Sequence, residues 1–220
     1  MTRNRVSRYW RVTLFASLAL SLAANFYFIR DAHAQRVTKP RIPPVTELLT
    51  DAQRQRNAAL GTQDAINIQT TMLNHPELLQ AFAVFAGHIL GKNTLPTRDR
   101  EILILRTGWL CRSEYEWAQH VRISRRLAGL TDDGFAHIMK GPDATGVSAH
   151  DRLLLLAATE LQDKAFISDE TWNALAETYD TKQMMDLVFT VGDYNLVSMA
   201  LNSFGVQLEP GLTGFPPGTR

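Results

Sequence analysis

Apolar residues recur at helical spacing through most of this sequence, and residues that favour helix starts stand before the periodic runs. Side chains three or four positions apart share one face of an α-helix, so this spacing predicts helices with one apolar stripe each. The sequence contains no Asn-Gly hairpin signal and no convincing alternating strand pattern. It therefore predicts an all-α, multi-helix bundle of about seven or eight helices, whose short connections favour antiparallel neighbours.

The helix boundaries are predicted from capping residues. Ser, Thr and Asp accept hydrogen bonds from the free amides of a first turn, proline fits the first turn, and glycine is favoured just after the last. Predicted helices cover 78–90 after Pro76, 98–110 after Thr97, 114–128 between Ser113 and Gly129, a short run after Thr131, 150–162 after Ser148, 171–179 after Ser168, and 184–204 after a capping box of Asp180 and Gln183.

Residues 1–34 have the features of an export signal. Four arginines precede residue 12, an uncharged and mostly apolar run covers 12–29, and Ala32, His33 and Ala34 form a cleavage-like motif. We expect a signal peptide cut after Ala34 and a periplasmic or secreted protein. An uncleaved membrane anchor is the alternative, because eighteen residues barely span a bilayer. A cytosolic protein with a misleading start is a third possibility.

The rest of the chain divides by composition. Residues 35–45 are rich in proline and basic residues and predict an extended linker, and residues 210–220 are rich in glycine and proline and predict an irregular tail. Residues 46–209 form the predicted helical domain. The formal net charge of +1 gives no indication of a nucleic-acid partner.

One predicted helix carries a histidine on its apolar stripe. His120 shares a face with Trp117 and Leu127, whereas the arginines of this helix lie on the opposite face. Glu116 lies one turn earlier, at the spacing that lets two side chains touch. A carboxylate and an imidazole in an apolar cleft shift each other's pKa, so the pair is a candidate for general acid–base chemistry.

Glu101 lies on the apolar face of the preceding predicted helix. A buried carboxylate is costly unless it has a partner. A short turn at residues 110–112 would fold Glu101 back toward Glu116 and His120. The three residues then form one predicted constellation of two carboxylates and an imidazole. We predict no metal, because no second histidine stands at ligand spacing.

Each of these residues also has a structural interpretation. Glu116 stands three residues after a serine, as in a capping box. His120 can be a hydrogen-bonded core histidine, and Glu101 can pair with Arg106 or Arg112. These interpretations remain open at the level of the sequence and are compatible with a shared site.

The sequence has one cysteine, Cys111, so it cannot form an internal disulfide framework. Its neighbours Trp109 and Leu110 favour burial of the thiol. Arg112 would lower the thiol pKa if the side chain were exposed. Burial is therefore expected for Cys111.

Two segments resemble the signature helix pair of the carboxymuconolactone decarboxylase and alkylhydroperoxidase D family. They are LPTRDREILIL at 95–105, and SEYEWAQHV at 113–121 followed by AGLT at 128–131. The resemblance covers about residues 66–206. It implies an all-helical, usually oligomeric protein with sites near subunit contacts and no cofactor.

The cysteine pair of the peroxidase branch is missing. That branch carries Glu, eleven residues, and then Cys-x-x-Cys-x-x-x-His. In this frame the first and last positions are Glu101 and His120, but the two cysteine positions are Ser113 and Glu116. Dithiol peroxidase chemistry needs an attacking thiolate and a resolving thiol. The chain therefore resembles the decarboxylase-like branch, whose known members act in aromatic compound catabolism.

The main hypothesis is a cofactor-independent lyase or isomerase acting on a small carboxylated lactone or aromatic-derived acid. His120 would transfer the proton, Glu116 would orient it, and Glu101 would be a second acid/base or a pKa modulator. Arg106 or Arg112 would bind the substrate carboxylate.

Two other functions stay open. One is a non-enzymatic binding or assembly module of the envelope, with a ligand groove or oligomer interface along residues 184–199. The other is peroxide chemistry through Cys111 alone. The resemblance also implies a homo-oligomer, and a membrane partner is expected only if the leader is uncleaved.

Overall fold

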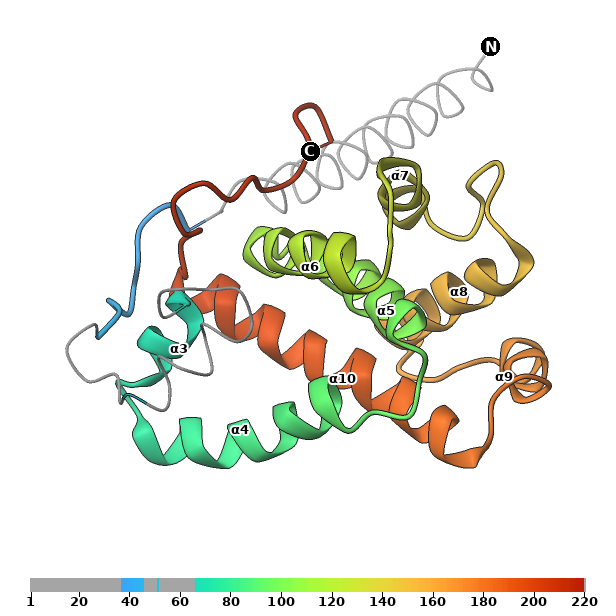
Figure 1. The fold of residues 1–220 in the computed structure, drawn as a ribbon, viewed down its shortest axis with the longest axis horizontal. Helices are drawn as coiled ribbons and strands as arrows, with labels where there is room; N and C mark the ends of the chain where they lie inside the picture. The colour runs from blue at the N-terminus through green and yellow to red at the C-terminus, as the bar shows by residue number, and fades with distance from the viewer. Residues whose placement is uncertain (1–36, 46–50, 52–65, 220) are drawn as a thin grey trace, which may run out of the picture. The chain divides into compact units, whose positions relative to one another are not determined.

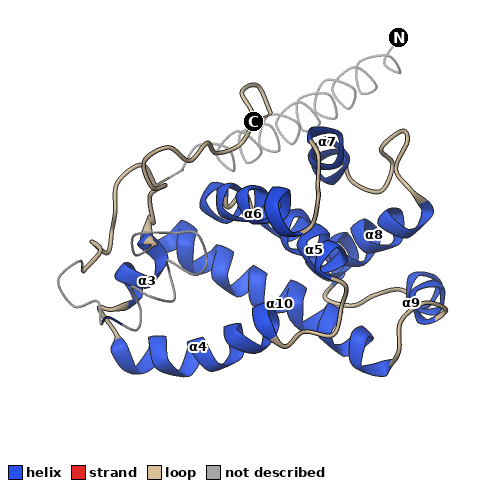
Figure 2. Ribbon diagram, viewed as in Figure 1, coloured by secondary structure: helices blue, strands red, loops and turns tan. Residues whose placement is uncertain are grey.

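The computed structural model describes residues 37–45, 51 and 66–219. The predicted leader at 1–34, with its cleavage position, lies outside these residues. The described helices are α3 (Asn67–Met72), α4 (Pro76–Gly91), α5 (Thr97–Leu110), α6 (Glu114–Leu127), α7 (Asp132–Lys140), α8 (Ala149–Lys164), α9 (Asp169–Ala176) and α10 (Thr181–Phe204). No strand occurs in this part of the chain (Figure 2), so the predicted all-α class is confirmed.

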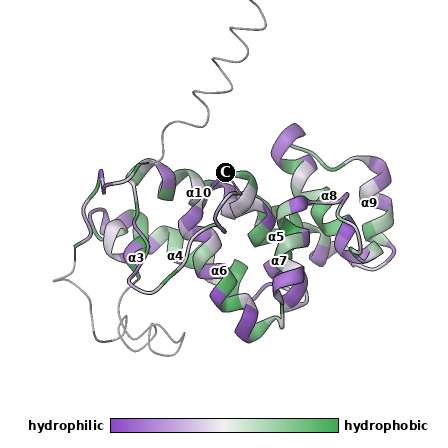
Figure 3. Ribbon diagram, turned by 90° about the horizontal axis from the view of Figure 1, so that it is seen from above, coloured by the Kyte–Doolittle hydropathy of each residue, from purple (hydrophilic) through white to green (hydrophobic). Residues whose placement is uncertain are grey.

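Helix α5 is the centre of the bundle. It packs against α8, α6 and α10, and α7 lies near it as well. The long helix α10 runs beside α5 and α6, and α4 lies along its other side (Figure 1). The main core cluster joins these helices through fully buried side chains such as Leu103, Leu105, Leu154 and Leu187. Polar and apolar residues alternate around the helices (Figure 3), as amphipathic helices on one core require.

Four predicted caps are confirmed. The side chains of Thr131, Ser148, Ser168 and Asp180 accept hydrogen bonds from the first turns of α7, α8, α9 and α10. Asp180 and Gln183 form the predicted capping box. These local signals are reliable because both partners lie within one turn of each other.

Two predicted caps are wrong. Thr97 lies inside α5, which begins after Pro96 without a side-chain cap. Ser113 precedes α6, but its hydroxyl is buried and forms no hydrogen bond in the described structure. Glu116, the other half of that expected capping box, turns to His120 instead. Gly129 does follow α6 with a φ of 63°, the left-handed conformation predicted there.

The non-helical ends of the described chain pack on the helices. The amide of Arg41 donates to the carbonyl of Phe204 at 2.8 Å, beside the end of α10. At the other end, Phe215 lies edge-on to Trp109, with ring centroids 5.0 Å apart. Within the described residues, no helix combines the length and the apolar composition that crossing a bilayer needs.

Candidate active site

The structure brings the three predicted site residues together. Glu101 comes from α5, and Glu116 and His120 come from successive turns of α6. The Nδ1 atom of His120 lies 2.8 Å from Oε2 of Glu101, and its Nε2 atom lies 3.0 Å from Oε1 of Glu116. Both ring nitrogens therefore face carboxylates, and the imidazole joins the two helices.

Glu101 is held by more than the histidine. The hydroxyl of Ser124 donates to its Oε2 atom at 2.9 Å, and Nη2 of Arg100 lies 3.5 Å from its Oε1 atom. Glu101 is fully buried, with an exposed fraction of 0%. Several donors around one buried carboxylate favour its ionised form.

The charges in this site support one another. Burial alone would lower the pKa of His120, but Glu101 and then Glu116 raise it to about 10. Burial would raise the pKa of Glu101, but His120, Ser124 and Arg100 together lower it. At neutral pH the site therefore contains an imidazolium beside an ionised Glu101. Removing one partner from such a buried group is expensive.

Helix α10 covers the imidazole with an aromatic ring. Tyr194 meets His120 edge-to-face, with ring centroids 5.0 Å apart. Burial, followed by the nearby carboxylates, raises the pKa of Tyr194 well above its usual value. The site roles of Ser124, Arg100 and Tyr194 were not predicted from the sequence. Ser124 lies on the same helix face as His120, and this position could have predicted its role. The contact of Tyr194 with His120 depends on how α10 packs, which the sequence does not show.

Arg106 was expected to bind a substrate carboxylate, and the structure shows its guanidinium in contact with α7 and α8. Its Nη1 atom donates to the carbonyls of Ile138 and Met139 at the end of α7, and Nε donates to Thr159. Gly141 has a φ of 91°, and a side chain there would collide with the Arg106 guanidinium. Arg106 therefore caps α7, where unpaired helix carbonyls attract a cation.

Arg112 is also not a partner of Glu101, whose contacts go to His120, Ser124 and Arg100. Arg112 lies in the turn between α5 and α6 with a φ of 53°, and its side chain is exposed. Among the described residues, Glu101 therefore pairs with His120, Ser124 and Arg100 and with neither predicted arginine.

Cys111 is half-buried, at the end of α5. Its Sγ lies 3.0 Å from Oδ1 of Asn195 and 3.6 Å from Oε1 of Gln162. Burial raises the pKa of the thiol, which favours the protonated form over the reactive thiolate.

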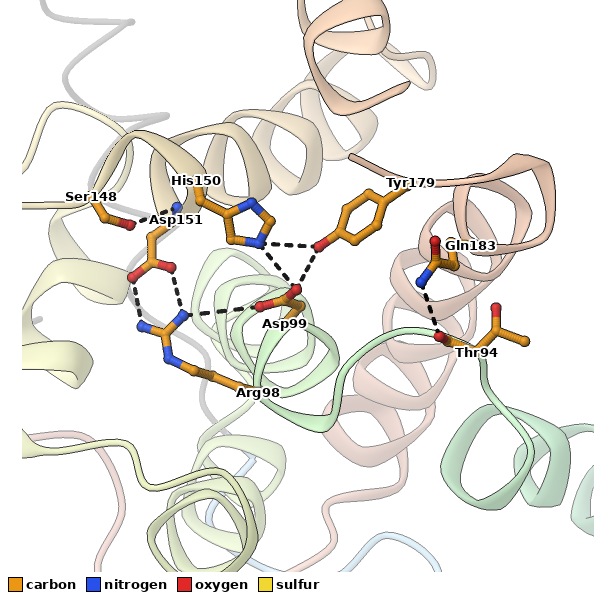
Figure 4. A network of polar contacts seen from close by, with 8 residues as sticks. All are labelled: Thr94, Arg98, Asp99, Ser148, His150, Asp151, Tyr179 and Gln183. Carbon is orange, nitrogen blue, oxygen red and sulfur yellow. Dashed lines mark hydrogen bonds and ion pairs between the residues drawn. The ribbon is translucent and has the colours of Figure 1, made fainter. Parts of the chain in front are cut away.

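A second polar network lies at the start of α5 (Figure 4). Oδ2 of Asp99 accepts from the Tyr179 hydroxyl at 2.6 Å and lies 3.0 Å from Nε2 of His150. Beside it, Arg98 forms a two-pronged ion pair with Asp151 at 2.6 and 2.7 Å. These contacts join the starts of α5 and α8 to the loop before α10, which is a structural role.

No set of three or more His, Cys, Asp or Glu side chains is placed to hold a metal ion in the described ranges 37–45, 51 and 66–219. A shallow pocket beside the second polar network is lined by Arg98, Ile102, Leu130, Gly134, His137, Ile138, Val147, Asp151 and Leu155. It includes none of the three site residues.

The fold is all-helical and of the alkylhydroperoxidase D-like type. Residues 76–160 match the carboxymuconolactone decarboxylase family. This segment contains Glu101, Glu116 and His120, so the part of the chain that holds the candidate site is similar to that family. Among curated proteins, none matches the sequence significantly.

Several solved structures share the fold. A peroxidase-related protein with an alkylhydroperoxidase AhpD core from Ralstonia eutropha JMP134 is 17% identical, with a TM-score of 0.68 over 80% of this chain and 95% of that one. Another from Silicibacter sp. TM1040 is 18% identical, with a TM-score of 0.65 over 79% and 95%. A cysteine-to-alanine variant of the debrominase Bmp8, in complex with 2,3,4-tribromopyrrole, is 16% identical, with a TM-score of 0.65 over 79% and 94%.

Proposed function

We propose that this protein is a cofactor-independent lyase or isomerase that acts by general acid–base chemistry on a small carboxylated lactone or aromatic-derived acid. The observation that carries the proposal is the placement of His120 between two buried carboxylates, Glu101 and Glu116. A site of this kind can accept and return a proton without a metal or a cofactor. The family match supports an enzyme of this type.

The burial of the three residues divides their roles. Glu101 is fully buried and cannot touch a substrate, so it acts as a positioning residue that holds the charge on His120. The side chains of His120 and Glu116 each keep about 6% exposure. These two groups are therefore the catalytic residues of the proposal, and a substrate must approach from their side.

Decarboxylation at this site would consume one proton in each turnover. The bond between the substrate carboxylate and its neighbouring carbon breaks, and its electron pair passes into a conjugated carbonyl group as CO2 leaves. The carbon then takes a proton from the site, and solvent restores that proton. An isomerisation would use the same two groups, one to remove a proton and the other to return it.

The experiment below also tests two alternative functions, thiol peroxide chemistry and non-enzymatic binding. Thiol peroxide chemistry is disfavoured because the half-buried Cys111 thiol has a raised pKa and no second cysteine is present. A non-enzymatic binding or assembly module is favoured by the exposed apolar side chains of α10, such as Met185, Phe189 and Met199. We also propose export through the leader at 1–34 and a homo-oligomeric state.

The test is turnover of a panel of carboxylated lactones, followed by CO2 release and ultraviolet absorbance. We expect His120→Gln to lower kcat by at least about 100-fold with the fold intact, the usual range for a general acid–base group. The matched control is His88→Gln, because His88 also faces a carboxylate, Asp186, at 2.9 Å, but outside the site.

Equal loss of activity in both histidine variants would indicate a general effect on folding and count against the proposed site. If a lactone of the panel binds but none is turned over, the result favours a non-enzymatic binding module over an enzyme. Loss of peroxide consumption in Cys111→Ser alone would favour the thiol route.

A further inference from the structure

A third carboxyl group lies buried near the candidate active site. Asp193 is on α10 next to Tyr194, whose ring contacts His120. Its exposed fraction is 4%, and its Oδ1 atom has no hydrogen-bond partner in the described part of the chain. A buried carboxylate oxygen without a donor is rare, because burial without a hydrogen bond is costly.

The charges around His120 do not balance if every group is ionised. Glu101, Glu116 and Asp193 would carry three negative charges, against two positive charges on His120 and Arg100. All five residues have exposed fractions of 8% or less. An uncompensated charge in such a site is expensive, so the cluster should take up one further proton at mildly acidic pH.

Hydrogen bonds decide which carboxyl keeps that proton. The carboxylate of Glu101 has three partners, which are His120, Ser124 and a more distant Arg100. The carboxylate of Glu116 pairs with the other ring nitrogen of His120. We propose that Asp193, the carboxyl with an unpartnered oxygen, holds the extra proton of this site and supplies it to the reaction through Glu116.

The electrostatics of α10 agree with this assignment. Burial and then the like charge of Glu116 raise the pKa of Asp193 to about 6. Three packed helices present titratable or charged groups to this stretch of α10. Helix α6 contributes Glu116, and α5 with the residue just after it contributes Arg100, Glu101 and Cys111. Helix α4 contributes His88, which pairs with Asp186.

The role of Asp193 rests on the proposed function, because decarboxylation consumes a proton. His120 is a poor final donor, since two carboxylates raise its pKa to about 10. A carboxylic acid that titrates near working pH is a better one. The O–H bond of Asp193 breaks, the proton passes to the carboxylate of Glu116 and then to the substrate carbon, and solvent reprotonates Asp193. Asp193 is a positioning residue because it acts through Glu116.

The experiment is a carboxyl ¹³C NMR titration of the full chain, followed by pH–rate profiles. We expect one aspartate to titrate near pH 6 and to disappear from the spectrum in Asp193→Asn. In Glu116→Gln the same signal should titrate about one pH unit lower, because the like charge is gone. Asp186→Asn is the matched control, because Asp186 is a buried aspartate two turns earlier on α10 whose oxygens are hydrogen-bonded.

The pH–rate profile tests the role of the proton. In the wild type, activity should fall as the pH rises through about 6. In Asp193→Asn this limb should vanish and kcat should drop about 10-fold or more, whereas Asp193→Glu should restore part of both. Asp186→Asn should keep the wild-type limb, even if it lowers stability.

The two proposals fail in different ways. Asp193 can titrate near pH 6 and respond to Glu116→Gln while no lactone is turned over. That result would support the buried proton on Asp193 and contradict the proposed lyase function. If turnover depends on His120 while Asp193 titrates in the ordinary aspartate range, the proton role of Asp193 is overturned. An unchanged pH–rate limb in Asp193→Asn would also overturn it.

Discussion

At the scale of single residues, the proton on His120 is tied to the stability of the fold. Its pKa of about 10 lies above the ordinary value of 6.5, so the folded state binds the proton more tightly than the unfolded state does. This contribution is fully present below pH 6.5 and is lost as the pH rises toward about 10. We expect the free energy of unfolding to fall over this window.

Glu101→Gln should remove most of this dependence. The change leaves His120 with one carboxylate and should cost about 3–5 kcal/mol of unfolding free energy at neutral pH, the usual loss when a buried ion pair is broken. The measurement is urea denaturation at several pH values between 6 and 10. Glu77→Gln is the control, because Glu77 faces His75 at 3.3 Å with both side chains largely exposed. A loss of similar size in both variants would contradict the buried-pair interpretation.

The thiol of Cys111 should react slowly in the folded protein. Burial raises its pKa, so the thiolate fraction at pH 8 is reduced. We expect modification by a thiol-specific disulfide reagent to be at least about 10-fold slower in the native protein than in urea-unfolded protein. Equal rates would indicate an accessible thiolate and would revive the single-cysteine hypothesis.

Spacing alone was enough to predict that Glu116 and His120 touch, because four residues make one helical turn. The meeting of Glu101 with His120 followed from the short turn between two helices. Asp193 was different, because its place near the site depends on the packing of α10, which no local pattern reports. The contacts of Arg106 were not predictable for the same reason, since its partners lie at the end of a helix more than thirty residues later.

At the scale of helices, two serines were both predicted to cap a helix, but only one of them forms the capping hydrogen bond. The hydroxyl of Ser148 accepts from the amide of Asp151 at 3.0 Å, whereas the hydroxyl of Ser113 is buried and unbonded in the described structure. Ser148→Ala should therefore cost about 1 kcal/mol of unfolding free energy. Ser113→Ala should cost less or slightly stabilise the protein, because it removes a polar group buried without a partner.

Urea denaturation of the two variants at one pH checks this prediction. A larger loss in Ser113→Ala than in Ser148→Ala would restore the capping-box interpretation of Ser113 and Glu116. The sequence could not separate the two serines, because both precede a helix with an acidic residue three positions later. What differs is the environment, since His120 recruits Glu116 away from the helix start.

For the described chain as a whole, the helical order was predictable and the role of its ends was not. Caps and periodicity located the helices because those signals are local. Residues 35–45 were expected to be an extended linker from their proline and basic content, and residues 210–220 an irregular tail from their glycine and proline content. The described parts of both segments, 37–45 and 210–219, lack helix and strand. Yet both contact the bundle, through Arg41 at the end of α10 and Phe215 beside Trp109. Composition predicts irregular backbone without saying whether it packs.

Phe215 should therefore contribute to global stability. Its ring lies 5.0 Å from that of Trp109 and 5.7 Å from that of Trp117, and its amide donates to Glu114 at 3.2 Å. Because the ring is only partly buried, Phe215→Ala should cost about 1–2 kcal/mol, less than a fully buried phenylalanine. Thr213→Ala, at an exposed position of the same segment, should change little. Thermal unfolding followed by tryptophan fluorescence measures both, and equal midpoints for Phe215→Ala and the wild type would mean that the tail does not support the bundle in solution.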